Sequence, residues 1–190
     1  TFLRSHPGHP DRPKGLLKLG TLQVDVYAAY SEAARTFEQL VSAHPEAPAA
    51  NQGRYHQARL ALLQDDFSRA RLLFSRLAER AQDSDLADRA RYELGLLHFY
   101  QGEFDAAAAR ADATSQDPAA DVANDAIELK TLLQENRGPD SLDAALQIYA
   151  QARLHQRQRA HRTALAQLDS LVQVHPRHPL ADNARFQRGT

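Results

Sequence analysis

A proline-containing motif recurs along this chain of 190 residues. The pattern His-Pro-x-x-Pro occurs at residues 6–10, 44–48 and 175–179. A second similarity links residues 86–93 (LADRARYE) with residues 180–187 (LADNARFQ). Repetition of this kind is typical of chains that stack similar small units rather than folding around one central core. The first constraint on the fold is therefore an array of repeats.

Two sets of equivalent residues, one aromatic and one small, predict the length of the repeat. The aromatic residues are Tyr55, Tyr92, Tyr149 and Phe186, and the alanines are Ala33, Ala70, Ala107 and Ala164. Successive members of each set lie 37 residues apart, except for one interval of 57 residues. We therefore expect a period of about 37 residues, with 20 additional residues inserted once.

Apolar residues recur with helical spacing, and no segment shows the signals of a strand. Glycine and proline mark the ends of helical segments, as at Gly102 and Gly138-Pro139. The predicted helices form pairs at residues 16–27 and 31–43, 50–64 and 67–81, 86–100 and 104–115, and 142–158 and 160–174. The predicted fold class is all-α.

The 20 additional residues also have a helical pattern, which adds one helix to the pairs. The apolar residues of its stripe are Val122, Ala126, Ile127, Leu129 and Leu133. The preceding helix, residues 104–115, is rich in alanine and offers little side-chain volume. We therefore expect the inserted helix, within residues 120–139, to pack over this thin helix and to bury Ile127 and Leu133.

Small residues twelve positions apart would let the two helices of a pair approach closely. These residues are Ala58 and Ala70, Gly95 and Ala107, and Ala152 and Ala164. Large apolar side chains follow at Phe37, Phe74 and Leu168, and prolines end repeats at Pro45 and Pro176. This pattern resembles the tetratricopeptide repeat. It departs from that family in its longer period and in Arg54, Arg91, Ile148 and Arg185, which stand where the family usually has a large aromatic residue.

The tetratricopeptide resemblance implies a right-handed α-solenoid of helix-turn-helix repeats. The expected boundaries are the end of a preceding repeat at 1–11, repeats at 12–48, 49–85 and 86–119, the inserted helix at 120–139, a fourth repeat at 140–179, and the start of another at 180–190. We expect the parent protein to be longer than this chain.

The lengthened turns and the tyrosine placement resemble bacterial envelope members of the family, of the Tol-Pal-associated and outer-membrane assembly lipoprotein types. This resemblance favours a location in the periplasm or at the periphery of the outer membrane, while the cytoplasm remains open. No cysteine is present, so disulfides and thiolate metal sites are excluded, but the redox compartment is not decided.

The charge balance argues against polyanion binding, because 23 basic residues face 24 acidic ones. We therefore expect no nucleic acid partner. The sequence has no apolar run long enough to cross a bilayer and no pattern of a signal peptide, so we also expect no direct membrane insertion.

In tetratricopeptide arrays the first helix of each pair lines a concave groove that binds a protein or peptide. The corresponding residues here are Tyr55, His56, Arg59 and Leu62, then Tyr92, Glu93, Leu96 and Phe99, then Tyr149, Ala150, Arg153 and Gln156. Tyrosine and arginine are frequent anchors of protein interfaces. The alternative is that the tyrosines only pack between repeats. The lysine and asparagine clamp that some relatives use for a terminal carboxylate does not occur at these positions.

A basic run crosses the last helix pair and could receive an acidic partner segment or phosphate. Its arginines are Arg153, Arg157, Arg159 and Arg162, with His155 and His161 between them. The alternative is an ordinary solvated face. The histidine pairs His6/His9 and His175/His178 straddle prolines in turns, and no further ligand completes a set, so we expect neither a metal nor a cofactor.

No motif of an enzyme active site occurs, neither a glycine-rich phosphate loop, nor G-x-S-x-G, nor H-E-x-x-H. The expected function is a scaffold or adaptor that binds a partner segment, not an enzyme. Two alternatives remain open at this point. The repeats could be a structural spacer or oligomerisation stack of a larger protein, or the targeting module of a longer enzyme.

Overall fold

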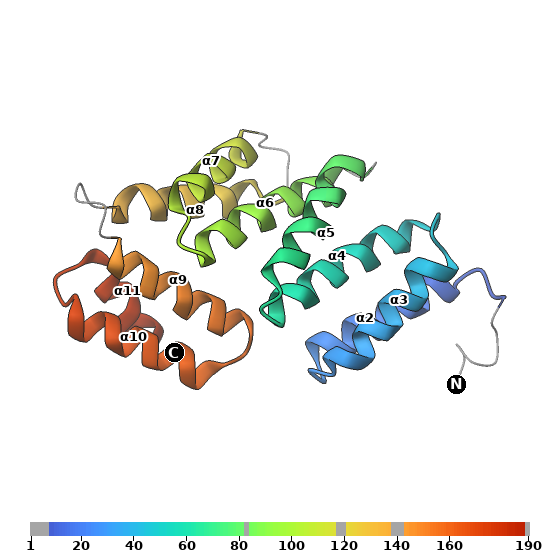
Figure 1. Ribbon diagram of the computed structural model, residues 1–190, viewed down its shortest axis with the longest axis horizontal. Coiled ribbons are helices and arrows are strands. Elements are labelled where there is room, and N and C mark those ends of the chain that lie inside the picture. The colour runs from blue at the N-terminus through green and yellow to red at the C-terminus, as the bar shows by residue number, and fades with distance from the viewer. Residues whose placement is uncertain (1–7, 82–83, 117–120, 138–142, 189–190) are drawn as a thin grey trace. The chain divides into compact units, whose positions relative to one another are not determined.

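The computed structural model describes residues 8–81, 84–116, 121–137 and 143–188. In these residues the chain is all-helical and contains no strand, which confirms the predicted fold class (Figure 1). The helices are α2 (Arg12–Asp25), α3 (Tyr30–Ala43), α4 (Pro48–Leu63), α5 (Phe67–Arg80), α6 (Ser84–Tyr100), α7 (Phe104–Ser115), α8 (Ala123–Asn136), α9 (Ala144–Arg157), α10 (His161–Val174) and α11 (Pro179–Arg188).

The chain forms two compact units, of which the first ends at Ala90 and the second begins at Arg91, within α6. In the first unit, α2 packs against α3 and α4, α3 against α4, and α4 against α5. In the second unit, α7 packs against α8, while α9, α10 and α11 pack against one another. Helices that follow one another in sequence thus pack together in both units, as an all-α repeat fold requires.

The turn inside each helix pair contains one residue with a left-handed backbone conformation. These residues are Ala28 (φ 50°), Asp65 (φ 61°), Gly102 (φ 75°) and Arg159 (φ 61°). Their spacing of 37, 37 and 57 residues equals that of the alanine set found in the sequence. The backbone of the described residues therefore repeats with the same period as the side chains.

The proline motif forms the turn between one helix pair and the next. Pro48 lies in the first turn of α4, where the missing N–H of proline costs no hydrogen bond. From α4, Arg54 donates to the carbonyl of Pro45 (3.2 Å) and to Asn51 Oδ1 (2.7 Å). In the copy at residues 175–179, Arg185 of α11 donates in the same way to the carbonyl of Pro176 (3.3 Å) and to Asp182 Oδ1 (2.6 Å). The arginine therefore ties each helix to the turn that precedes it.

Helix α8, the predicted insertion, packs against α7 as expected. Leu133 is buried, and two ion pairs join the helices, Lys130 with Asp112 (2.5 Å) and Arg137 with Asp105 (2.6 Å). The prediction that Ile127 is buried is wrong, because 48% of this residue is exposed. Ile127 follows the buried Ala126 and therefore lies about 100° around the helix from it.

Candidate functional site

The predicted partner-binding residues of the first unit lie on α4, which packs against both α3 and α5. Tyr55 and His56 are half-buried, whereas Leu62 is fully buried and belongs to the core. The ring of Tyr55 lies edge-on to Phe74 of α5, with 5.7 Å between centroids. Tyr55 therefore packs between helices and offers only part of its surface to a partner.

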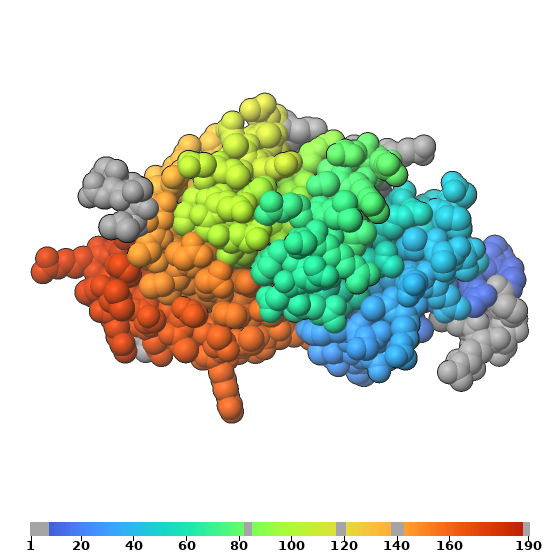
Figure 2. Space-filling model, viewed as in Figure 1, coloured from blue at the N-terminus to red at the C-terminus, as the bar shows by residue number. Residues whose placement is uncertain are grey.

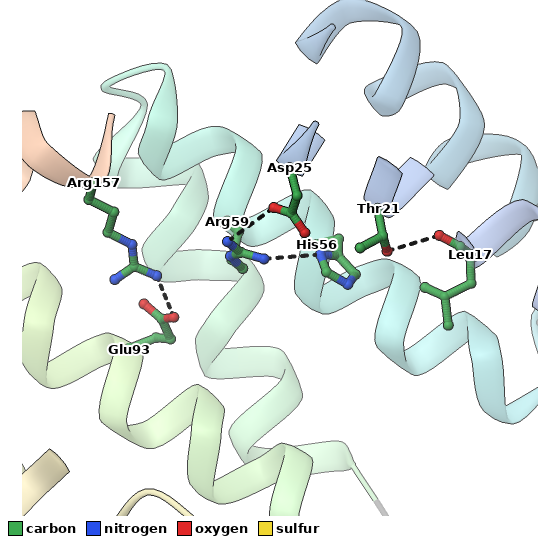
Figure 3. Close-up of polar contacts among 7 residues, drawn as sticks. All are labelled: Leu17, Thr21, Asp25, His56, Arg59, Glu93 and Arg157. Atoms are coloured by element: carbon green, nitrogen blue, oxygen red, sulfur yellow. Dashed lines mark hydrogen bonds and ion pairs between the residues drawn. The ribbon is translucent and has the colours of Figure 1, made fainter. Parts of the chain in front are cut away.

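His56 lies in an apolar and cationic environment. Its ring stacks on Phe37 of α3, with centroids 5.0 Å apart and planes 4° from parallel. Arg59 lies 3.5 Å from His56 Nδ1, and its guanidinium pairs with Asp25 of α2 at 3.8 Å (Figure 3). Burial and the charge of Arg59 lower the pKa of His56 from 6.5 to about 4, against the opposing effect of Asp25. His56 is therefore neutral at physiological pH.

The pKa of His56 predicts a pH dependence of stability. Between pH 6.5 and about 4 the unfolded chain binds a proton at this residue that the folded chain excludes, so stability falls as the pH falls through this window. His56→Phe keeps an aromatic ring beside Phe37 but cannot titrate. Between pH 7 and 4 we expect this variant to lose about 2 kcal/mol less unfolding free energy than the wild type. Urea denaturation at both pH values measures the difference, and equal losses would contradict the prediction.

In the second unit, predicted residues from two helices meet at one pocket. Tyr92, Leu96 and Phe99 of α6 line it together with Arg153 of α9. Its volume is about 160 Å³. Tyr92, Leu96 and Phe99 belong to the predicted repeat at residues 86–119 and Arg153 to the one at 140–179, and the fold brings them together. Helix α8 also lines the pocket, with residues that the sequence analysis did not select, including Asp125, Glu128 and Leu132.

The pocket contains opposite charges beside aromatic rings. The guanidinium of Arg153 lies 6.0 Å from the centroid of the Tyr149 ring, a distance that allows a cation–π contact. Tyr92 packs against Val122 and Ala123 at the start of α8. Burial, reinforced by the carboxylate of Asp125, raises the pKa of Tyr92, so its hydroxyl keeps its proton and can donate a hydrogen bond.

Other residues predicted to face a partner are buried instead. Phe99 and Tyr149 are 2% and 3% exposed, and Ala150 is fully buried. The hydroxyl of Tyr149 accepts a hydrogen bond from Gln187 of α11 (2.9 Å), and Gln156 donates to the same glutamine (3.1 Å). Helix α11 therefore engages the part of α9 that the sequence analysis assigned to the groove.

Glu93 was predicted to face the groove and Arg157 to belong to the basic patch. In the structure these two residues form an ion pair with each other. Glu93 is 4% exposed, and its Oε1 accepts a hydrogen bond from Arg157 Nη2 at 2.5 Å (Figure 3). Burial opposes the charge of the guanidinium, but the nearby carboxylate outweighs it, and the pKa of Arg157 is raised. Glu93 therefore belongs to the interior of the second unit, and Arg157, whose side chain is 21% exposed, is held against it.

The predicted basic patch is therefore smaller than its sequence suggests. Arg157 is withdrawn into the ion pair with Glu93, while Arg153 lines the pocket beside α6 and α8. Arg159 and Arg162 are exposed, at the turn between α9 and α10 and in the first turn of α10. These four arginines have three different environments and do not form one uniform cationic face.

His178 has a structural role in its proline turn. His178 Nδ1 accepts a hydrogen bond from the backbone N–H of Leu180 (3.2 Å), at the start of α11. His6 lies outside the described residues. In the part of the chain that the structure describes, no group of three or more histidine or carboxylate side chains could hold a metal ion.

A cavity in the first unit was not anticipated from the sequence. It lies between α3, α4 and α5, has a volume of about 660 Å³ and contains three arginines in its lining. The sequence does show Arg76 and Arg80 one helical turn apart on one helix. Their presence in one cavity with Arg54 depends on the packing of α3, α4 and α5, which the sequence does not reveal.

Comparison of the chain with protein-family models and with curated proteins finds no match. The likeness to tetratricopeptide repeats therefore depends on the residues of this chain alone. Among the helices in the described ranges, none is long and apolar enough to cross a membrane.

Proposed function

We propose that the chain is a tetratricopeptide-like interaction module that binds a segment of a partner protein and is not an enzyme. The observation that supports this proposal best is the pocket formed by α6, α8 and α9, where Tyr92, Leu96 and Arg153 come together. Tyrosine and arginine at such a position are typical of the few residues that dominate binding energy at protein interfaces.

The size of the pocket favours a peptide over a small-molecule substrate. Pockets that hold small ligands have volumes of roughly 300–1,000 Å³. This pocket, at about 160 Å³, suits one anchoring side chain of a longer partner segment. Leu96, Leu129 and Leu132 supply apolar contacts, and the carboxylates of Asp125 and Glu128 could pair with a basic residue beside the anchor.

A display experiment with random peptides tests this proposal, using a variant that fills the pocket. Leu96→Arg places a long charged side chain at the pocket, whereas Leu165→Arg makes the same change on α10, where 43% of the leucine is exposed. Peptides selected on the wild type should bind Leu96→Arg at least ~10-fold more weakly and the control within ~2-fold. Circular dichroism must first show that both variants remain folded.

A structural spacer is the second candidate, and the burial of Tyr149, Phe99 and Glu93 favours it. These residues stabilise helix packing and leave little surface for a partner. Selection of no peptide family on the wild type, or equal binding by wild type and Leu96→Arg, would contradict the partner-binding proposal and support the spacer.

A further inference from the structure

The cavity between α3, α4 and α5, called the arginine groove below, is a second surface that the proposed pocket of the other unit does not include. Its volume of about 660 Å³ lies within the range of pockets that hold ligands. Helices α3 and α5 both lie at the surface in the view of Figure 2. The groove belongs entirely to the first unit.

The arginine groove has an apolar lining and a cationic border. Val41 of α3 and Leu73 and Leu77 of α5 provide the apolar part. Among the described residues, the charged ones that line the groove are Arg54, Arg76, Arg80 and Glu46, so that cations outnumber anions there. Such a groove can contact an apolar side chain and bind anionic groups at the same time.

The three arginines differ in how firmly they are held. Arg54 is fixed by its hydrogen bonds to Pro45 and Asn51, contacts that Arg185 repeats in the other proline turn. Arg76 and Arg80 are exposed, and no described residue forms an ion pair or a hydrogen bond with either side chain. The guanidinium of Arg54 is therefore held in one orientation, whereas the N–H groups of Arg76 and Arg80 can donate to a ligand.

Guanidinium groups bind carboxylates and phosphates through paired hydrogen bonds. The groove itself favours carboxylates on a peptide over nucleic acid. Among the described residues, its lining contains no aromatic ring on which a base could stack. The chain as a whole also has a net charge of −1, so it has no general attraction for polyanions.

The spacing of the cations indicates the pattern that a peptide must have. Arg76 and Arg80 are four residues apart on α5, which places them about 6 Å apart along the helix axis. Alternate residues of an extended peptide are separated by roughly 6–7 Å. Acidic residues at alternate positions of an extended peptide would therefore meet both guanidiniums, and a leucine-like residue two positions beyond them, on the same face of the peptide, would meet the apolar lining.

We propose that the arginine groove binds an acidic, extended peptide segment, with carboxylates on Arg76, Arg80 and Arg54 and an apolar side chain on Leu73 and Leu77. This inference does not depend on the partner proposed for the second unit.

An array of short labelled peptides tests the proposal, each with two glutamates and a leucine at alternate positions or at varied spacing. Matched peptides with glutamine in place of glutamate provide the first comparison. The wild type should bind at least one glutamate peptide ~10-fold more tightly than its glutamine counterpart, because charge-assisted hydrogen bonds would be lost. The double variant Arg76→Glu and Arg80→Glu should lose this binding at least ~10-fold.

The control variant makes the same charge change outside the groove, by Arg35→Glu on α3 and Arg69→Glu on α5, both exposed. It should bind the glutamate peptide within ~3-fold of the wild type. Equal losses in the two double variants, equal binding of glutamine peptides, or the absence of binding by every array peptide would overturn the proposal. Tighter binding of a single-stranded oligonucleotide or of inorganic phosphate than of any glutamate peptide would also overturn it.

Discussion

Replacement of Arg157 by alanine is expected to lower the unfolding free energy of the second unit by about 3–5 kcal/mol. The substitution leaves Glu93 at 4% exposure without the guanidinium that lies 2.5 Å from its Oε1. A buried carboxylate that loses its cation must remain charged at low dielectric or take up a proton, and either state destabilises the fold. Urea denaturation followed by circular dichroism measures the loss, and hydrogen exchange in α6 and α9 locates it.

Two further variants separate the ion pair from a general effect of charge. Arg162→Ala removes an exposed arginine in α10 and should cost less than about 0.5 kcal/mol. Replacing both partners, by Glu93→Leu with Arg157→Met, should recover most of the loss, since a buried ion pair can often be exchanged for apolar packing. A loss in Arg157→Ala no larger than in Arg162→Ala would contradict the importance of the pair.

The helices could be predicted from the sequence because their signals are local. Residues 104–115 were predicted as a helix, and α7 spans Phe104–Ser115. Predicted and observed helix ends differ where a proline is compatible with either a loop or the first turn of a helix. The first helix was predicted to begin at residue 16, but it begins at Arg12, since Pro13 is as compatible with the first turn of a helix as with a preceding loop.

The left-handed turn residues were largely hidden in the sequence. Glycine marks this conformation only at Gly102, while alanine, aspartate and arginine occupy the other three positions. A residue with a Cβ adopts a positive φ only at some cost in energy. Alanine, aspartate or arginine in the sequence therefore does not predict a left-handed conformation. The regular spacing of the four turns became visible only in the backbone.

The composition of the candidate site could be predicted only in part. Tyr92, Leu96 and Arg153 were selected by their register within the repeats, and they meet at one pocket. The burial of Glu93 depends on Arg157, 64 residues further along the chain, and no local pattern specifies such a contact. Part of the pocket is formed by α8, the inserted helix. The repeat pattern does not include this helix, so its pocket residues could not be predicted from their position in a repeat.

Replacement of Phe37 by alanine is the second change with a large expected effect, about 3–5 kcal/mol. Phe37 is fully buried in the first unit and belongs to a cluster with Val24, Ala33 and Leu60. Its other face stacks on His56 at 5.0 Å, so the alanine variant would leave a cavity that its neighbours cannot easily fill. The exposed Leu72→Ala provides the control, with a loss of less than about 0.5 kcal/mol.

Gly20 supplies a sharper test of the same contact, because a Cβ atom at this position would lie 2.4 Å from Cε1 of Phe37. Gly20→Ala alone should therefore cost about 1–3 kcal/mol, despite the better helix propensity of alanine. In the Phe37→Ala background the obstructing ring is absent, and the same substitution should become neutral or stabilising by about 1 kcal/mol. A double-mutant cycle measured by urea denaturation gives this coupling, and additive effects would show that α2 and α3 do not meet through Gly20 and Phe37.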